Sequence, residues 1–177
     1  TIYTGGEFRQ DETIHKNEVI KKTLHMKNHK LTIANGVSLE FQNASKLIVE
    51  DGQLVIGDND NTNITLNFIN KNWSENNGVF CYRSPVRIKN ATIKNASCGL
   101  YSHISPGDII DGLKTDNSHT GISLYYSYNN GIDNTIIRNS QFTNTQLWGI
   151  TMVGSKPVLH DNTFHNSEQT GTGIRAV

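Results

Sequence analysis

The stretch WGITMVGSKPVLHDNTFHNSEQTGTGI, residues 148–174, contains the same Gly-Ile pair near its start and at its end, as Gly149-Ile150 and Gly173-Ile174. A similar Gly-led phrase occurs upstream as GVFCYRS from Gly78, GLYSHIS from Gly99 and GISLYYS from Gly121. These five glycines follow one another at spacings of 21, 22, 28 and 24 residues. A recurrence of about 20 to 50 residues indicates a repeat architecture, in which each unit completes the core of its neighbour.

Each Gly-led phrase is interpreted as one short strand, in which side chains two positions apart share a face. The second and fourth positions are mostly apolar and are expected to point inward: Val79, Leu100, Ile122, Ile150 and Ile174, then Cys81, Ser102, Leu124, Met152 and Ala176. The third and fifth positions are expected to face outward: Phe80, Tyr101, Ser123, Thr151 and Arg175, then Tyr82, His103, Tyr125 and Val153.

A second recurrence separates these strands, as VRIKNATIKN, DIIDGLKTDN, GIDNTIIRN and VLHDNTFHN. Each segment closes on an asparagine, at Asn95, Asn117, Asn139 and Asn166. Asparagine tolerates left-handed backbone conformations and therefore suits a tight corner between strands. Stacked asparagine amides can also bond one another along the repeat axis.

Short strands at a period of about 22 residues exclude helical repeats, which need a 3.6-residue periodicity. The L-x-x-L-x-L pattern of leucine-rich repeats is also absent. The sequence thus predicts an all-β fold, a single-stranded right-handed parallel β-helix (solenoid) of about seven to eight coils. Residues 1–30 are expected to form an N-terminal cap and first coil, and residues 31–177 the other coils of the same domain. The C-terminal end is expected to be uncapped, with remaining parts of a parent polypeptide beyond Val177.

The first half of the chain allows two interpretations. KLTIANGVSLEF, residues 30–41, alternates polar and apolar residues around Asn35-Gly36, a pair that is typical of antiparallel hairpins. Parallel coils are favoured because the period of the later repeat requires them. The expected inward positions are Leu31, Ile33, Val37, Leu39 and Phe41.

Length and charge limit the possible partners. The 177 residues fit one domain, and 16 basic side chains balance 16 acidic ones, so neither a nucleic-acid surface nor an anionic-membrane surface is expected. No apolar run approaches the roughly 20 residues that span a bilayer, so membrane insertion is not expected either. The two cysteines, Cys81 and Cys98, allow one disulfide or none.

The first coils carry a family resemblance. Residues 19–41, VIKKTLHMKNHKLTIANGVSLEF, together with SKLIVEDGQLVIG and NITLNF, resemble the first coils of secreted bacterial right-handed β-helix proteins. The later coils are similar to the parallel β-helix repeat of the pectin-lyase-like superfamily, and the likeness covers almost the whole chain. It implies a secreted or cell-surface location. The superfamily includes pectate and alginate lyases, polygalacturonases, phage tailspikes, epimerases and non-catalytic surface domains, so the resemblance does not imply one activity.

Enzymes of this superfamily generally work on the outer face of the strand that corresponds to the Gly-led phrase. Flat rings in a row suit stacking on sugar faces, although exposed aromatic clusters also cover loops or neighbouring domains. The insertion YYSYNNG, residues 125–131, could place Tyr126 and Tyr128 beside this face. The candidate carbohydrate-binding residues are Phe80, Tyr82, Tyr101, His103, Tyr125, Tyr126 and Arg175.

Catalysis is an alternative to binding alone. His103 could act as a general base, and Arg83 could neutralise a uronate carboxylate as a polysaccharide lyase requires. An inert surface histidine and a solvated arginine are the competing interpretations. No acidic residue is expected in the outward columns, which disfavours hydrolysis of glycosidic bonds by paired carboxylates.

Metal binding has one weak candidate. GDNDNTN, from Gly57, offers Asp58 and Asp60 as hard oxygen ligands for calcium, but it lacks the glycine at the sixth position of an EF-type loop. An ordinary turn is the favoured interpretation, and no other cofactor is expected.

The favoured function is extracellular polysaccharide recognition by a non-catalytic part of a larger secreted or cell-surface protein. The first alternative is an enzyme of the pectin-lyase-like superfamily, either a uronate-directed polysaccharide lyase or a glycoside hydrolase. The second alternative is a structural stalk or adhesin domain.

Overall fold

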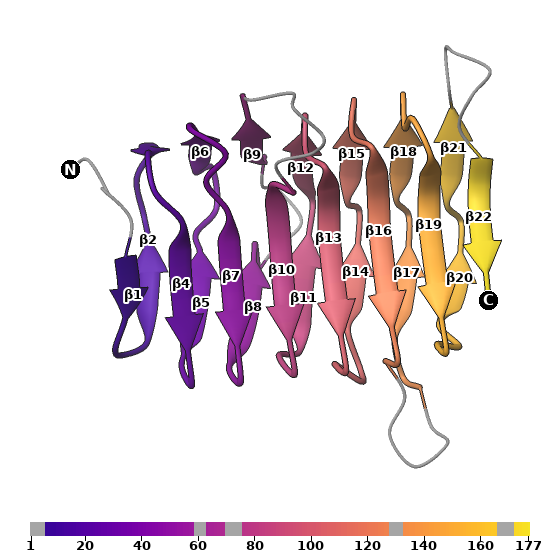
Figure 1. Cartoon of the computed structure of the whole chain (residues 1–177), viewed down its shortest axis with the longest axis horizontal. Helices are drawn as coiled ribbons and strands as arrows, with labels where there is room; N and C mark the ends of the chain where they lie inside the picture. The colour runs from indigo at the N-terminus through magenta and orange to yellow at the C-terminus, as the bar shows by residue number, and fades with distance from the viewer. Residues whose placement is uncertain (1–5, 59–62, 70–75, 128–132, 166–171) are drawn as a thin grey trace.

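The computed structural model describes residues 6–58, 63–69, 76–127, 133–165 and 172–177. Every regular element within these ranges is a β-strand, and each strand pairs in parallel with strands of the neighbouring coils (Figure 1). The strands form three sheets, A, B and C, of eight, seven and seven strands.

Successive strands of the chain enter sheets A, B and C in turn. Sheet A contains β1 (Gly6–Phe8), β4 (Leu24–Lys27), β7 (Leu47–Glu50), β10 (Gly78–Tyr82), β13 (Cys98–His103), β16 (Thr120–Tyr125), β19 (Trp148–Val153) and β22 (Thr172–Ala176). Sheet B contains β2 (Glu12–Ile14), β5 (Lys30–Ile33), β8 (Gln53–Ile56), β11 (Val86–Lys89), β14 (Ile109–Asp111), β17 (Ile136–Arg138) and β20 (Val158–His160). Sheet C contains β3 (Glu18–Ile20), β6 (Ser38–Phe41), β9 (Ile64–Phe68), β12 (Ala91–Lys94), β15 (Lys114–Asp116), β18 (Gln141–Thr143) and β21 (Thr163–His165).

This order of strands describes a solenoid. In Figure 1 the strands of sheet A run downward in front, those of sheets B and C run upward behind them, and the chain advances from left to right, so the coil is right-handed. The predicted fold class is therefore confirmed. Within the described residues the set of three strands occurs seven times before β22, and the stack makes about six turns, slightly fewer than the seven to eight expected.

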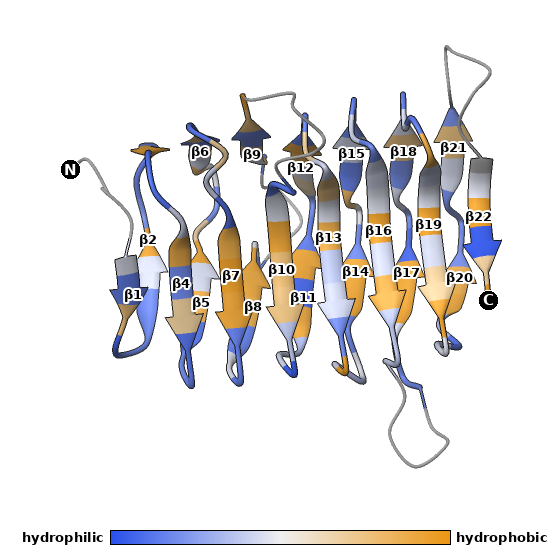
Figure 2. Cartoon of the chain, viewed as in Figure 1, coloured by the Kyte–Doolittle hydropathy of each residue, from blue (hydrophilic) through white to orange (hydrophobic). Residues whose placement is uncertain are grey.

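The predicted register of the Gly-led phrases is also confirmed. Val79 pairs with Leu100, Leu100 with Ile122, and Ile122 with Ile150, and all four side chains are fully buried. Ile174 continues the column on β22, where its side chain is 46% exposed. Hydrophilic residues gather mostly in the corners between strands (Figure 2).

The first half of the chain forms coils as well. β5 and β6 belong to different sheets, so Asn35-Gly36 is a corner between two sheets and not a hairpin turn. The five expected inward positions of this segment, from Leu31 to Phe41, are all buried. The parallel interpretation was therefore correct, and the antiparallel alternative was wrong.

The glycine of the phrase is required by close packing between coils. A Cβ atom on Gly121 would lie 2.4 Å from the carbonyl oxygen of Gly149 and 2.6 Å from Cδ1 of Phe142. A Cβ atom on Gly99 would lie 2.5 Å from the carbonyl oxygen of Gly121. All three separations are below van der Waals contact, so a larger residue would push the coils apart.

The serine that ends each phrase forms a ladder at the corner between sheets A and B. The Ser105 hydroxyl accepts a bond from the Ser84 N–H (2.9 Å), and the Ser84 hydroxyl accepts one from the Gly52 N–H (3.0 Å). In the next two coils, the Ser155 hydroxyl accepts a hydrogen bond from the Ser127 N–H (3.1 Å). The ladder satisfies backbone donors that would otherwise lack partners where the strands end.

Asparagines hold the corner between sheets C and A. The side chain of Asn95 donates to that of Asn67 (2.7 Å), and Asn117 donates to Asn95 (2.5 Å), so the corner prediction is confirmed at these two residues. Asn139 also lies at a corner, the one between sheets B and C, where its φ is 51°, and Asn144 follows β18 at the C–A corner. Asn166 lies outside the described residues.

Candidate functional site

A groove of about 410 Å³ lies on the outer face of sheet A, across β10, β13, β16 and β19. The third and fifth positions of the phrases contribute Phe80, Tyr82, Tyr101, Ser123, Tyr125 and Thr151. The first positions of the strands and the residues before them contribute Asn76, Ser97, Cys98, His119, Thr120, Leu147 and Trp148. The groove thus lies on the face that the repeat pattern indicated.

Aromatic rings pack against one another at one side of the groove. The Tyr101 ring centroid lies 5.8 Å from that of Phe80, 5.7 Å from that of Tyr82 and 5.4 Å from that of Tyr125. The planes of these pairs are tilted by 33° to 52°. Because each ring touches its neighbours, the cluster is ordered before any ligand arrives, which lowers the entropy lost on binding.

Hydroxyl groups line the groove beside the rings. Thr120, Ser123 and Thr151 are buried, although they belong to the outward side of sheet A. Phe80, also on this side, is only 4% exposed. The Oγ1 atom of Thr151 is buried and has no hydrogen-bond partner. The groove lining therefore includes a residue whose buried polar atom is not satisfied within the protein.

The titratable groups with shifted pKa values in the groove are kept neutral by burial. Burial raises the pKa of Tyr82 and of Tyr101 above the ordinary value of 10.0. Burial also raises the pKa of the Cys98 thiol to about 12. At neutral pH both phenols and the thiol are protonated.

Three of the predicted carbohydrate-binding residues lie outside the groove lining. The His103 ring lies beside two tyrosine rings, with its centroid 6.1 Å from that of Tyr82 and 6.2 Å from that of Tyr101. Tyr126 is exposed at the corner after β16, and its ring lies against Gly154, where an added Cβ atom would be 2.6 Å from Cδ1 of the ring. The Arg175 guanidinium lies over the Trp148 ring, 4.6 Å from its centroid. Tyr128 lies outside the described residues.

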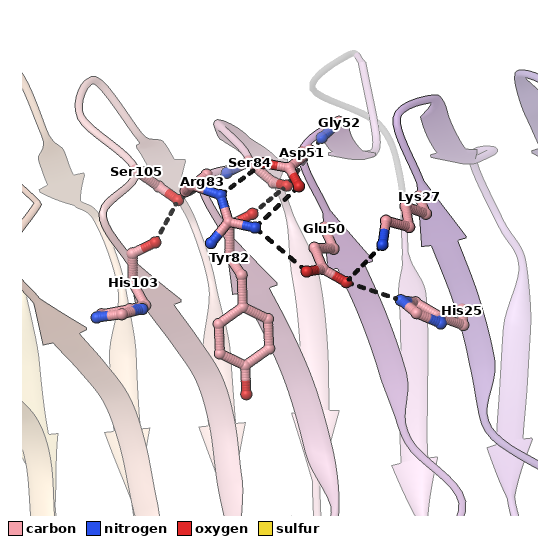
Figure 3. Close-up of polar contacts among 10 residues, drawn as sticks. All are labelled: His25, Lys27, Glu50, Asp51, Gly52, Tyr82, Arg83, Ser84, His103 and Ser105. Atoms are coloured by element: carbon pink, nitrogen blue, oxygen red, sulfur yellow. Dashed lines mark hydrogen bonds and ion pairs between the residues drawn. The ribbon is translucent and has the colours of Figure 1, made fainter.

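Arg83 is held by two carboxylates on the preceding coil (Figure 3). Its Nε and Nη2 atoms bind the two oxygens of Asp51 at 2.5 and 2.8 Å, and Nη2 also lies 3.2 Å from Oε1 of Glu50. The hydrogen bonds that Arg83 donates to Asp51 raise the pKa of Arg83, and the same bonds lower the pKa of Asp51. The charge of Arg83 is therefore already compensated.

Glu50 corrects the expectation that the outward columns contain no acidic residue. It pairs in register with Tyr82, so it continues the column of Tyr82, His103 and Tyr125 onto β7. His25 (3.4 Å) and Lys27 (4.0 Å) contact its carboxylate from β4. Alignment of LIVED, residues 47–51, with VFCYR, residues 79–83, would have revealed Glu50. The expectation was wrong because only the Gly-led strands were aligned.

The residues that precede each phrase were also missed as groove residues. Asn76, Ser97, His119 and Leu147 come one or two residues before the strands of sheet A and reach the groove from the corner. Asn77 and Ser97 bond each other across neighbouring coils, where the Ser97 N–H donates to Oδ1 of Asn77 at 2.7 Å. No recurrent residue type marks these positions in the sequence.

The remaining candidates have local partners. Asp58 accepts a hydrogen bond from the side chain of Asn35 (2.5 Å), and Asp60 lies outside the described residues. Within the described ranges, no group of three or more His, Cys, Asp or Glu side chains is arranged to hold a metal ion. Cys81 and Cys98 are both buried and free.

Comparisons with known proteins give no family for the chain. No protein-family model, no curated protein and no solved structure matches it significantly. Among the described residues, no helix is long and apolar enough to cross a membrane.

Proposed function

We propose that the groove on sheet A binds polysaccharide, and that the chain is a non-catalytic recognition domain of a larger secreted or cell-surface protein of the pectin-lyase-like β-helix type. The supporting observation is the cluster of Phe80, Tyr82, Tyr101 and Tyr125 along one side of a groove that also contains buried hydroxyls. Sugars have apolar C–H faces and hydroxyl edges, so both surfaces of the groove have a matching surface on the ligand.

The dimensions of the groove fit this proposal. Its volume of about 410 Å³ lies within the range of about 300 to 1,000 Å³ that is usual for ligand pockets. The groove crosses four parallel strands, so a ligand that lies along the solenoid axis would meet an outward residue of each coil in turn. A polymer of regular repeat is a suitable ligand for such a periodic surface.

Two contacts favour recognition over a lyase activity. A uronate lyase needs a cation at the substrate carboxylate, but Arg83 is engaged by Glu50 and Asp51. A lyase also needs a base that reaches the substrate, but His103 lies beside the tyrosines and outside the groove lining.

Mutation of the tyrosine cluster tests the proposal. After a ligand is found on a glycan array, we expect Tyr101→Ala and Tyr125→Ala each to weaken binding by about tenfold, because hot-spot aromatic side chains contribute most to such contacts. Tyr126→Ala is the matched control, since Tyr126 is exposed outside the groove, and it should leave the affinity unchanged.

Two results would contradict the proposal. If no polysaccharide binds, the stalk or adhesin alternative is supported. If uronate polymers yield products with the absorbance of an unsaturated uronate, the chain is a lyase.

A further inference from the structure

The groove carries no fixed charge. Of the described residues that line it, none is aspartate, glutamate, lysine or arginine. The phenols of Tyr82 and Tyr101 and the thiol of Cys98 are protonated at neutral pH. A carboxylate bound here would lose hydration without gaining a lysine or arginine partner in the lining, which is unfavourable.

Two cationic side chains contact aromatic residues of the groove lining from outside it. Lys46 Nζ lies 5.5 Å from the centroid of Phe80, and the Arg175 guanidinium lies 4.6 Å from the centroid of Trp148. Neither Lys46 nor Arg175 belongs to the groove lining. Beyond Tyr82 the next residue of the outward column is Glu50, which adds negative charge and not positive charge on that side.

Thr151 supplies a positive requirement for the ligand. Its Oγ1 atom is buried in the groove lining without a hydrogen-bond partner. Ser123, in register with Thr151 on the adjacent strand, presents a second buried hydroxyl to the same groove. A hydroxyl can both donate and accept, so a sugar hydroxyl satisfies Thr151 whichever way its proton points.

From these contacts we infer that the groove selects neutral sugar residues over uronates, with Thr151 as a direct hydrogen-bonding partner of a sugar hydroxyl. This inference rests on the proposed polysaccharide-binding function and narrows it to a substrate class. It separates this chain from the uronate-directed activities considered for its fold.

The selectivity is tested by calorimetric titration of the full chain with two sets of oligosaccharides of equal length. The neutral set contains cello-, xylo- and manno-oligosaccharides, and the acidic set contains oligogalacturonate and oligomannuronate. We expect at least one neutral ligand to bind at least about tenfold more tightly than either uronate. Binding of the neutral ligand should be insensitive to salt, since no ion pair forms.

The role of Thr151 is tested with Thr151→Val, which removes the hydroxyl and keeps the shape of the side chain. The matched control is Thr135→Val, because Thr135 is also buried with an unpartnered Oγ1 but lies outside the groove. We expect Thr151→Val to weaken the neutral ligand by about three- to tenfold, as loss of one hydrogen bond does, and Thr135→Val to have no effect. Both variants should unfold at the same urea concentration as the unmodified chain or a higher one, since each removes an unsatisfied hydroxyl.

The outcomes separate the two proposals. Tighter binding of uronates, weakened by salt and by Arg175→Gln, would overturn the neutral-sugar inference and leave polysaccharide recognition intact. Equal affinities of Thr151→Val and Thr135→Val would overturn the role of Thr151. If neither set binds, or if Tyr101→Ala has no effect on binding, polysaccharide recognition by this groove fails and the inference fails with it.

Discussion

At the scale of single residues, Asp108 has the most unusual environment among the described carboxylates. It is fully buried where the chain enters β14, with Oδ1 accepting the Val86 N–H (2.8 Å) and Oδ2 lying 2.6 Å from the Ser102 hydroxyl. Burial raises its pKa from the ordinary value of 3.8 to about 7, although these two hydrogen bonds and nearby Arg87 act in the opposite direction. Asp133 adds a further upward contribution.

The raised pKa predicts a specific pH dependence of stability. Between about pH 4 and pH 7 the unfolded chain has lost the Asp108 proton but the folded chain retains it, so stability falls as pH rises. The stability contributed by protonated Asp108 is complete below the pKa of the unfolded chain and is lost as pH rises through the pKa of the folded chain. Between these two values the free energy of unfolding falls by at most about 1.4 kcal/mol per pH unit. Asp108→Asn, which cannot ionise, should lack this slope in urea unfolding measured from pH 4.5 to pH 8.

The difference in free energy of unfolding between the unmodified chain and Asp108→Asn isolates the effect of Asp108, because the other titratable groups are the same in both proteins. Asp51, with its lowered pKa, contributes stability that is lost only at more acidic pH, as it is protonated. Parallel stability curves for the unmodified chain and Asp108→Asn would show that Asp108 ionises normally in the folded protein.

At the scale of elements, the Gly-led strand combines three position-specific requirements. The glycine permits close approach of adjacent coils, the inward residues fill the core, and the serine accepts a backbone N–H at the corner. The residue before the serine has a positive φ in every such phrase, including 54° at Ile104, which is unfavourable for a β-branched residue. The hydrogen bonds between neighbouring coils therefore hold Ile104 in a left-handed conformation that it would not adopt on its own.

The glycine requirement predicts a position-dependent effect of added Cβ atoms. Gly121→Ala should lower the free energy of unfolding by about 2 kcal/mol or more, because the new atom meets the Gly149 carbonyl oxygen and the Phe142 ring. Gly173→Ala is the matched control, since its Cβ would lie 3.5 Å from the nearest atom, in ordinary contact. Urea unfolding of both variants measures the difference, and equal destabilisation would disprove the packing explanation.

At the scale of the whole molecule, stability depends on coverage of each coil by the next. Ile122 and Ile174 occupy the same column of sheet A, but Ile122 is fully buried and Ile174 is 46% exposed. The hydrophobic contribution of a repeat thus comes from its neighbours as much as from its own residues.

The difference in burial predicts that truncation to alanine destabilises the protein more at Ile122 than at Ile174. Ile122→Ala should lower the free energy of unfolding by about 2 to 5 kcal/mol, the range for a buried isoleucine, and Ile174→Ala by less than about 1 kcal/mol. Chemical denaturation at one protein concentration checks both values. A large loss for Ile174→Ala would mean that Ile174 is buried against another surface in solution.

The pairing of the later coils could be predicted residue by residue because the Gly-led phrase marks the same point in each coil. Once Val79, Leu100, Ile122 and Ile150 are aligned, the two-residue alternation of a strand assigns every inward side chain. The aromatic side of the groove followed from the same alignment. Glu50 was not found because its coil lacks the Gly-Ile pair. The sequence did not show which corner each asparagine occupies, because asparagines with positive φ lie at two corners of the coil.

The sequence by itself determined the repeat, the parallel coil and the inward columns, because these depend on local alternation and on glycines and asparagines at tight positions. Only the tertiary structure decided the burial and the partners of the outward side chains. Phe80 and Thr151 are buried on the outer face, and Arg83 forms an ion pair with Asp51, 32 residues earlier in the chain. The coils differ in length, from 18 residues between Gly6 and its partner Leu24 to 32 residues between Leu47 and its partner Val79, so the side chains of adjacent coils meet according to where the corners place them. Outward contacts therefore depend on the assembled stack, whereas the alternation within one strand is enough to show which of its side chains point inward.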